Sequence, residues 1–141
     1  MGDLESRISA SFRAHGLMAM LGAELLHVAE GEVQVALAPR PELCPHGQIH
    51  AGALSSILDA ACSYAAMTVA QPGVDVLTVE FKLKFIRPAA HADRFLAVGK
   101  VTQQVGTTLT MCQGEIIGEQ GLQQEAIAVM QATISNVRSN A

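Results

Sequence analysis

The chain has 141 residues and a net charge of −4, and half of its residues are apolar while only 16% are charged. A chain of this length can bury a sizeable core, and we expect residues 1–141 to form one domain. The negative charge disfavours nucleic acid as a partner, because phosphate contacts require a basic face. With so few charges, some apolar surface is expected to be buried between subunits.

Cellular location follows from cysteine usage and from the absence of targeting signals. The three cysteines are widely spaced and include no C-x-x-C pair, which fits a reducing cytoplasm better than a disulfide framework. The first residues are charged and contain no apolar h-region, so no signal peptide is expected. The longest apolar stretch contains Asp59, whereas a membrane span needs about 20 clean apolar residues. We therefore expect a cytoplasmic protein that does not associate with membranes.

The first third of the chain predicts a helix and a hairpin. Residues 3–14 repeat apolar side chains at i, i+4 and i+8, which predicts a helix that ends at Gly16. Two short extended runs, 23–29 and 32–38, flank Glu30-Gly31 and predict a β-hairpin. Residues 39–49 contain several prolines and are expected to form a loop.

The stretch from Ala51 to Ala70 predicts a long helix at the centre of the fold. Nearly all of its residues are apolar, and a helix that is apolar on nearly all sides must be buried on nearly all sides. Its polar residues share one stripe at i, i+3 and i+4 spacing: Ser55, Ser56, Asp59 and Ser63. No Lys or Arg lies within one turn of Asp59. Because an unpaired buried carboxylate is costly, either the fold satisfies Asp59 or the residue serves chemistry.

Four long strands are expected after this helix. The first, 76–87, alternates apolar and polar residues and predicts one buried face: Leu77, Val79, Phe81, Leu83 and Phe85. Residues 94–104, 107–117 and 122–137 predict three more strands joined by glycine turns. A meander of twisted strands can curl around a buried helix. The expected fold class is therefore α+β, with a long antiparallel sheet wrapped around a central helix (about residues 50–70) and a short N-terminal helix.

The stretch from Cys44 to Tyr64 resembles hotdog-fold acyl-CoA thioesterases of the phenylacetic-acid-degradation (PaaI-like) family. Their pattern is roughly N-x-x-G-x-x-H-G-G, with Asp or Glu in the helix nine residues after the His. The aligned residues here are Cys44, Gly47, His50, Ala51, Gly52 and Asp59. Later, Phe85-Ile86-Arg87-Pro88-Ala89 matches the family's aromatic-x-x-Pro-Ala run. The resemblance covers about residues 20–137.

The resemblance implies a hotdog fold that hydrolyses acyl-CoA thioesters at a site shared by two subunits. It implies that Asp59 acts as nucleophile or as general base for water. The backbone N–H of Ala51 would polarise the thioester carbonyl, with Gly52 beside it, and His50 would orient the thioester or water. A helix start presents unpaired N–H groups and a positive dipole end, which agrees with this role. Because Ala51 and Asp59 lie two helical turns apart, about 12 Å, one helix cannot place both groups on one carbonyl.

Residues expected to bind the acyl-CoA follow from the same resemblance: Cys44, Gly47, Thr78, Arg87, Pro88, Gly106 and Thr107. Thr78 aligns with a polar residue near the active site of relatives, but threonine is also an ordinary strand former. Arg87, with Lys82 and Lys84, either meets the phosphates of coenzyme A or belongs to a solvated face. The family needs no metal and no cofactor, because coenzyme A is part of the substrate. The expected assembly is a homodimer or homotetramer, since pairing across a two-fold axis covers sheet edges.

Two departures from the family pattern keep alternatives open. Cys44 stands where the family has Asn, and Ala51 stands where it has Gly. Alanine keeps the N–H, but a thiol cannot replace a carboxamide. His46 could take over that role, and a Cys44 nucleophile with His46 or His50 as its base is a further alternative.

Structural roles and other functions also remain open. Asp59 could be hydrogen-bonded to Ser55, to Ser63 or to a facing backbone, and His50 could be only a helix cap. The competing functions are a non-catalytic acyl-CoA-binding protein, which the Cys44 departure favours, and a hydratase or dehydratase on the same fold.

Overall fold

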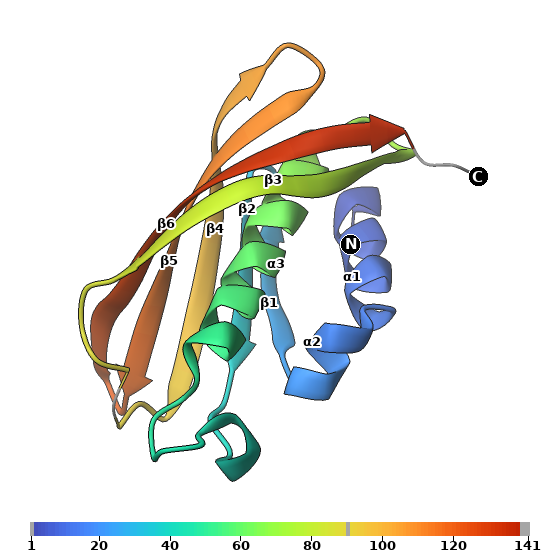
Figure 1. Cartoon of the computed structure of the whole chain (residues 1–141). Helices are drawn as coiled ribbons and strands as arrows, with labels where there is room; N and C mark the ends of the chain where they lie inside the picture. Colours follow the sequence, from blue (N-terminus) through green and yellow to red (C-terminus); the bar gives the residue numbers. More distant parts are fainter. Residues whose placement is uncertain (1, 90, 139–141) are drawn as a thin grey trace.

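The computed structural model describes residues 2–89 and 91–138. Two helices, α1 (Asp3–Arg13) and α2 (Gly16–Leu21), precede a hairpin of β1 (Glu24–Ala29) and β2 (Glu32–Leu37). A short 3-10 turn, η1 (Pro41–Leu43), leads into the long helix α3 (Ala51–Val69). Four long strands complete the described part of the chain (Figure 1): β3 (Val74–Phe85), β4 (Arg94–Val105), β5 (Leu109–Gln120) and β6 (Gln123–Arg138).

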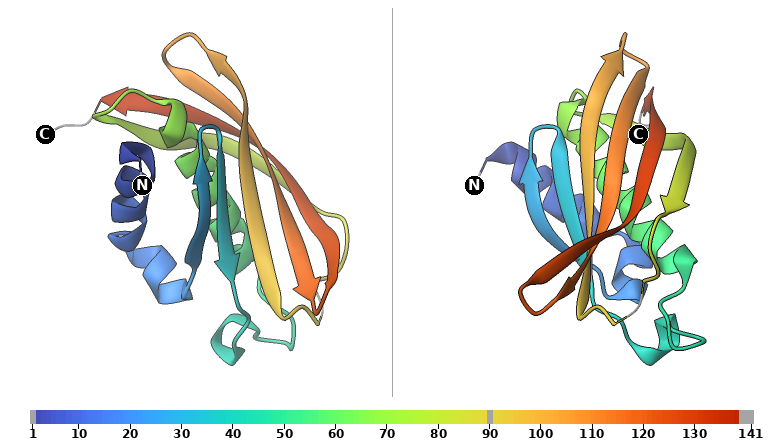
Figure 2. Two further views of the ribbon diagram at one scale, coloured as in Figure 1. Left: turned by 180° about the vertical axis from the view of Figure 1, so that it is seen from behind. Right: turned by 90° about the vertical axis from the view of Figure 1, so that its left-hand side faces the viewer.

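The strands form one antiparallel sheet in the order β1-β2-β4-β5-β6-β3. The sheet is strongly twisted and curls around α3, while α1 and α2 lie beside β1 (Figure 1 and Figure 2). This arrangement confirms the predicted α+β hotdog architecture. It leaves β1 and β3 as the two edge strands, so that β3 follows α3 in the chain yet lies at the far edge beside β6.

Helix α3 is buried along most of its length, as predicted from its composition. Leu54, Ile57 and Leu58 are fully buried in the core. The helix also lies very close to β4, because a Cβ added at Gly99 would meet the backbone carbonyl carbon of Ala61 at 2.5 Å. Within the described residues, no helix is both long enough and apolar enough to span a membrane.

The N-terminal region contains a second helix that the prediction missed. Gly16 was expected to end the first helix, but α1 ends at Arg13 and Gly16 begins α2. The Nδ1 atom of His15 accepts a hydrogen bond from the Met18 N–H at 3.4 Å and caps α2. Met18 is buried in the core. Tertiary packing of Met18 and the His15 cap therefore override the tendency of Gly16 to stop a helix.

Strand β3 has a β-bulge between Thr78 and Glu80, which makes the prediction of a single apolar face wrong. Before the bulge, Thr78 faces α3 and Leu77 is 62% exposed. After the bulge the parity changes, and Leu83 packs against the core. The extra residue, Val79, is 59% exposed. The bulge is thus what lets Thr78 and Leu83 face the same helix although they are five positions apart.

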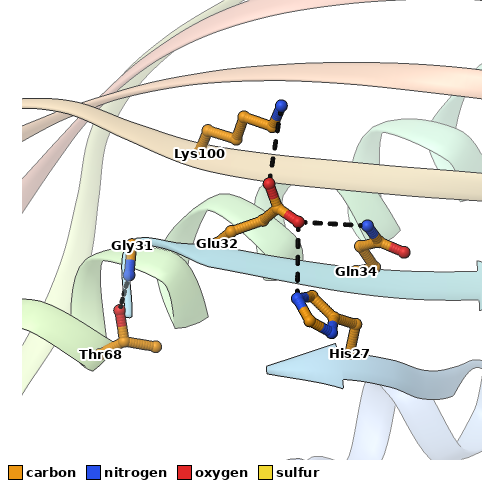
Figure 3. A network of polar contacts seen from close by, with 6 residues as sticks. All are labelled: His27, Gly31, Glu32, Gln34, Thr68 and Lys100. Atoms are coloured by element: carbon orange, nitrogen blue, oxygen red, sulfur yellow. Dashed lines mark hydrogen bonds and ion pairs between the residues drawn. The ribbon is translucent and has the colours of Figure 1, made fainter. Parts of the chain in front are cut away.

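The β1–β2 hairpin is fixed to both the sheet and the helix (Figure 3). The Glu32 carboxylate lies 3.6 Å from His27 Nε2 on β1 and 3.6 Å from Lys100 Nζ on β4. The Gly31 N–H in the turn donates to Thr68 Oγ1 on α3 at 2.7 Å. An exposed ion pair such as Glu32–Lys100 contributes about 0–1 kcal/mol, so the β2–β4 ladder and the contact to α3 are the firmer anchors of the hairpin.

Candidate active site

The start of α3 is organised by His50, which is the N-cap residue of the helix. Its backbone is extended (φ −64°, ψ 136°), and its Nδ1 accepts a hydrogen bond from the Gly52 N–H at 2.8 Å. A Cβ at position 52 would lie 2.9 Å from that Nδ1 atom, so glycine is needed for this cap. Because Nδ1 accepts, the neutral His50 imidazole carries its hydrogen on Nε2. His50 is therefore the N-cap of α3 through Nδ1, and its Nε2–H remains an exposed hydrogen-bond donor.

The two N–H groups predicted to polarise a thioester carbonyl differ in availability. The Gly52 N–H is used by the His50 cap. Within residues 2–89 and 91–138, no group accepts a hydrogen bond from the Ala51 N–H, and Ala51 is exposed. Ala51 is the first residue of α3 and has no positive φ, so alanine fits where the family has glycine. The helix start thus offers one free backbone donor at the positive end of its dipole.

Asp59 lies half-buried in the middle of α3 and receives its hydrogen bond from the sheet. Its Oδ1 accepts from Thr78 Oγ1 on β3 at 2.6 Å. The earlier serines of the polar stripe point elsewhere, since Ser55 and Ser56 donate to the Gly52 carbonyl oxygen at 3.1 and 2.7 Å. In the part of the chain that the structure describes, no group donates to Oδ2 of Asp59. This oxygen remains available to water or to a carbonyl carbon.

Thr78 has a second neighbour, Ser63, that the sequence did not assign to the site. The Oγ atoms of Thr78 and Ser63 lie 3.2 Å apart. The sequence signal was the position of Ser63 one helical turn after Asp59, on the same stripe. Thr78 was expected to contact acyl-CoA, which stays a prediction, and its hydroxyl donates to the Asp59 carboxylate.

The loop before α3 holds Cys44 and Gly47 near the helix start. The carbonyl oxygen of Cys44 accepts a hydrogen bond from the Gly47 N–H at 3.2 Å, and Gly47 has a φ of 83°, which favours glycine. The Cys44 side chain is half-buried. Among the described residues its thiol makes no hydrogen bond to His46 or His50, so the geometry gives a Cys44 nucleophile no base.

Arg87 and Pro88 follow β3 at the same end of the sheet as the start of α3 (Figure 1 and Figure 2). The Arg87 guanidinium donates to the Ala126 carbonyl oxygen at 2.8 Å and lies 3.0 Å from the Glu125 carboxylate. Pro88 lines a surface pocket of about 340 Å³. Arg87 is thus tied to β6 within its own chain, although its side chain is still about half exposed.

Gly106 and Thr107 lie at the opposite end of the sheet, in the turn between β4 and β5 (Figure 1). Gly106 has a φ of 59°, and the Thr107 carbonyl oxygen accepts from the Asn136 side chain at 3.1 Å. Within one chain the predicted binding residues are therefore spread over both ends of the sheet, with Asp59 between them.

The remaining two cysteines are packing residues. Cys62 and Cys112 are buried, and the Cys112 thiol donates to the Cys62 carbonyl oxygen at 3.5 Å. Burial raises the pKa of the Cys112 thiol to about 12 and raises the pKa of Cys62 well above its ordinary value. Both thiols are therefore protonated near neutral pH and unreactive. In the described residues, no group of three or more His, Cys, Asp or Glu side chains is placed to hold a metal ion.

The chain matches the family model described as the thioesterase superfamily over residues 46–123. A thioesterase family protein from Silicibacter pomeroyi shares 34% identity and superimposes with a TM-score of 0.91, covering 96% of this chain and 99% of that one. The PaaI protein of the E. coli phenylacetic acid degradation operon shares 21% identity (TM-score 0.83, 95% and 93% covered). A Haemophilus influenzae thioesterase shares 17% identity (TM-score 0.83, 100% and 94% covered). No curated protein matches the chain significantly.

Proposed function

This chain belongs to the thioesterase superfamily, and we propose that it is an acyl-CoA thioesterase of the PaaI-like type. It hydrolyses an aromatic or a short- or medium-chain acyl-CoA to the free acid and coenzyme A. One observation carries this proposal: a mostly apolar helix has a single charged residue, Asp59, whose carboxylate is oriented by Thr78 through Oδ1, while Oδ2 has no donor among the described residues. A half-buried carboxylate without a cationic partner does not stabilise the fold, and it is therefore a candidate catalytic group.

The reaction needs two kinds of group: a donor that stabilises the thioester oxygen, and a base or nucleophile that attacks the carbonyl carbon directly or through water. The Ala51 N–H donates to the thioester oxygen, where negative charge develops as the carbonyl carbon is attacked, and one such donor is typically worth about 10²–10³ in rate. Asp59 either takes a proton from the attacking water or attacks the carbonyl carbon itself. The C–S bond then breaks, and coenzyme A leaves as its thiolate. If Asp59 acts as the base, it passes the proton of the attacking water to this thiolate. If Asp59 is the nucleophile, the mixed anhydride formed on its carboxylate is hydrolysed by water, which releases the acid, restores the carboxylate and supplies the proton. The Nε2–H of His50 is exposed at the same helix start as Ala51 and orients the thioester or the water.

The two roles come from different subunits in this proposal, because Ala51 and Asp59 are two helical turns apart, about 12 Å. Strand β3 is an edge strand of twelve residues, and its exposed Leu77 and Val79 are apolar. Such an edge favours pairing with a second copy. Antiparallel pairing of two β3 edges would place the first half of one strand, which holds Thr78, beside the second half of the other.

This two-fold pairing supports a composite site. The second half of β3 ends at the side of the sheet where α3 begins (Figure 1). Asp59 and Thr78 of one chain would therefore approach the helix start and Arg87 of its partner. We propose that the smallest active unit is a homodimer, and that a homotetramer would consist of two such dimers. The proposal requires no cofactor or metal. We place the enzyme in the cytoplasm, which is supported by three free cysteines.

The test is the release of free thiol from a panel of aromatic, short-chain and medium-chain acyl-CoAs. Wild type and Asp59→Asn are assayed side by side, because asparagine keeps the side-chain size and still accepts the hydrogen bond from Thr78. We expect the wild type to release thiol and Asp59→Asn to lose at least tenfold in kcat, with an unchanged thermal unfolding temperature. The panel also ranks the acyl groups.

Other outcomes would redirect the assignment. A variant that keeps more than a tenth of the wild-type rate contradicts the role of Asp59. A folded wild type that binds acyl-CoA and releases no thiol from any substrate supports a non-catalytic acyl-CoA-binding protein, and Cys44 would then be the first position to restore to asparagine. An active 14.8 kDa monomer in sedimentation would contradict the composite site.

A further inference from the structure

Three side chains in the middle of the molecule form a short hydrogen-bonded chain with a fixed direction. Thr78 Oγ1 donates to Asp59 Oδ1 at 2.6 Å and lies 3.2 Å from Ser63 Oγ. A threonine hydroxyl has one hydrogen and two lone pairs. Because its hydrogen is used on the carboxylate, Thr78 can only accept from Ser63. The order of donation is therefore Ser63 to Thr78 to Asp59.

We infer that Ser63 is a positioning residue for Asp59, acting through Thr78. This inference rests on the proposed thioesterase function, in which Asp59 touches the substrate or the attacking water. Ser63 itself does not contact Asp59 by a hydrogen bond, although both lie on α3 one turn apart. Its donation occupies a lone pair of the Thr78 oxygen and commits the only Thr78 hydrogen to Oδ1.

The backbone around Thr78 shows why such a third residue is useful. Thr78 directly precedes the β-bulge of an edge strand, so the ladder on one side of it is interrupted, and among the described residues no strand lies beyond it. A threonine hydroxyl in that setting can rotate toward other acceptors, such as backbone carbonyl groups or water. Ser63 comes from the packed helix α3, most of which is buried. Ser63 on the packed helix can therefore fix the orientation of the Thr78 hydroxyl, which the bulged edge strand does not fix by itself.

The arrangement has a consequence for catalysis. With Thr78 held on Oδ1, Oδ2 of Asp59 is the carboxylate oxygen without a donor among the described residues, and the carboxylate has one defined orientation. A hydrogen bond donated into the Thr78 oxygen also strengthens the bond that Thr78 donates onward. Loss of Ser63 is expected to lower kcat by about three- to tenfold, the range that one neutral hydrogen bond supports. Because Ser63 does not touch the acyl-CoA, KM should stay within about twofold in the same comparison.

The experiment compares thiol release by wild type, Ser63→Ala, Ser63→Thr, Thr78→Val and the double variant Ser63→Ala/Thr78→Val. Thr78→Val, which removes the donor to the carboxylate, should lower kcat by about 10- to 100-fold. Ser63→Thr keeps a hydroxyl and should recover kcat to within about twofold of wild type. The double variant should be no slower than Thr78→Val alone, since Ser63 acts only through Thr78. Ser9→Ala on α1, which removes a helix serine that takes no part in the hydrogen bonds of Ser63, Thr78 and Asp59, is the matched control and should behave as wild type.

Two results would overturn the inference. The first is a Ser63→Ala enzyme with wild-type kcat, and the second is additive loss in the double variant, which would mean that Ser63 acts without Thr78. Crystal structures of wild type and Ser63→Ala test the role of Ser63 independently of thioesterase activity. If the wild type releases no thiol, the proposed function fails, and the structures still decide the hydrogen-bonded chain. Rotation of Thr78 away from Asp59 in Ser63→Ala supports it, and an unchanged Thr78–Asp59 contact overturns it.

Discussion

The start of α3 and its middle hold their polar groups in opposite ways. At the start, His50 satisfies the Gly52 N–H and leaves the neighbouring Ala51 N–H exposed and free within the described structure. In the middle, the Asp59 carboxylate is half-buried and receives a hydrogen bond from Thr78 on β3. One region offers an unused donor to the outside, and the other holds a prepared acceptor against the sheet. The proposed composite site uses this difference, because the free N–H of one subunit would face the carboxylate of its partner.

The sharpest way to break this comparison is to delete the donor and leave the helix intact. Ala51→Pro removes the free N–H, and proline is favoured at the first position of a helix. His50, with a ψ of 136°, already has the extended backbone that a following proline requires. We expect kcat to fall by about 10²–10³ with little change in thermal unfolding temperature. Steady-state kinetics and calorimetry measure the two quantities.

The matched comparison for this variant is Ala51→Ser, which keeps the backbone N–H and enlarges the side chain. It should retain kcat within about threefold if the N–H is what matters. Equal losses in the serine and proline variants would show that the side chain at position 51, rather than the backbone donor, limits the reaction.

The second prediction tests whether Ala51 and Asp59 of one active site come from different subunits. Ala51→Pro and Asp59→Asn chains are each nearly inactive, but a mixed dimer holds one site in which both defects meet and one site that is intact. Random mixing at equal amounts makes half of the dimers mixed, so activity should return to about a quarter of wild type. The measurement is thiol release after co-unfolding and refolding the two variants. Continued inactivity of verified mixed dimers would place both groups of a site in one chain.

The smallest expected effect separates the two roles of His50. His50→Ala loses the helix cap and should lower the free energy of unfolding by about 1 kcal/mol, whereas His50→Asn supplies a good N-cap and should restore most of it. Neither variant has the exposed imidazole Nε2–H, so both should lose about tenfold in kcat, the worth of one hydrogen bond. Urea unfolding and thiol release are measured on both variants. Wild-type activity in His50→Asn would mean that His50 is only a cap.

Much of the helix half of this site could be predicted from the sequence because the signals there are local. The run from Cys44 to Asp59 identified the helix, its start and its isolated carboxylate, and the 1.5 Å rise per residue fixed the separation of Ala51 from Asp59. Local signals failed at Gly16, which was expected only to end the first helix: α1 does end just before it, but a second helix, α2, starts there with a cap from His15 and a buried Met18.

For the strand half of the candidate site, the family resemblance named Thr78, but the residue pattern could not predict which way Thr78 faces, because that depends on contacts between distant segments. Alternation over residues 76–87 predicted one apolar face, and nothing in the alternation marked the bulge after Thr78. Side-chain direction in a strand has a period of two, so a single extra residue reverses every later position. Whether Thr78 or Leu77 faced α3 therefore depended on the pairing of β3 with β6.

The sequence by itself determined most of the elements of this protein, α2 excepted, and the candidate residues on α3. The reason is that helix periodicity, hairpin glycines and the His50 to Asp59 spacing are properties of neighbouring positions. Only the tertiary structure decided that β3 lies at the sheet edge, that its bulge turns Thr78 toward Asp59, and that Ser63 donates to Thr78. The physical reason is the sequence separation of the interacting residues. A helix satisfies its backbone and orders its faces within a few residues, whereas a strand acquires its partner, its register and its faces from segments that the chain reaches much later.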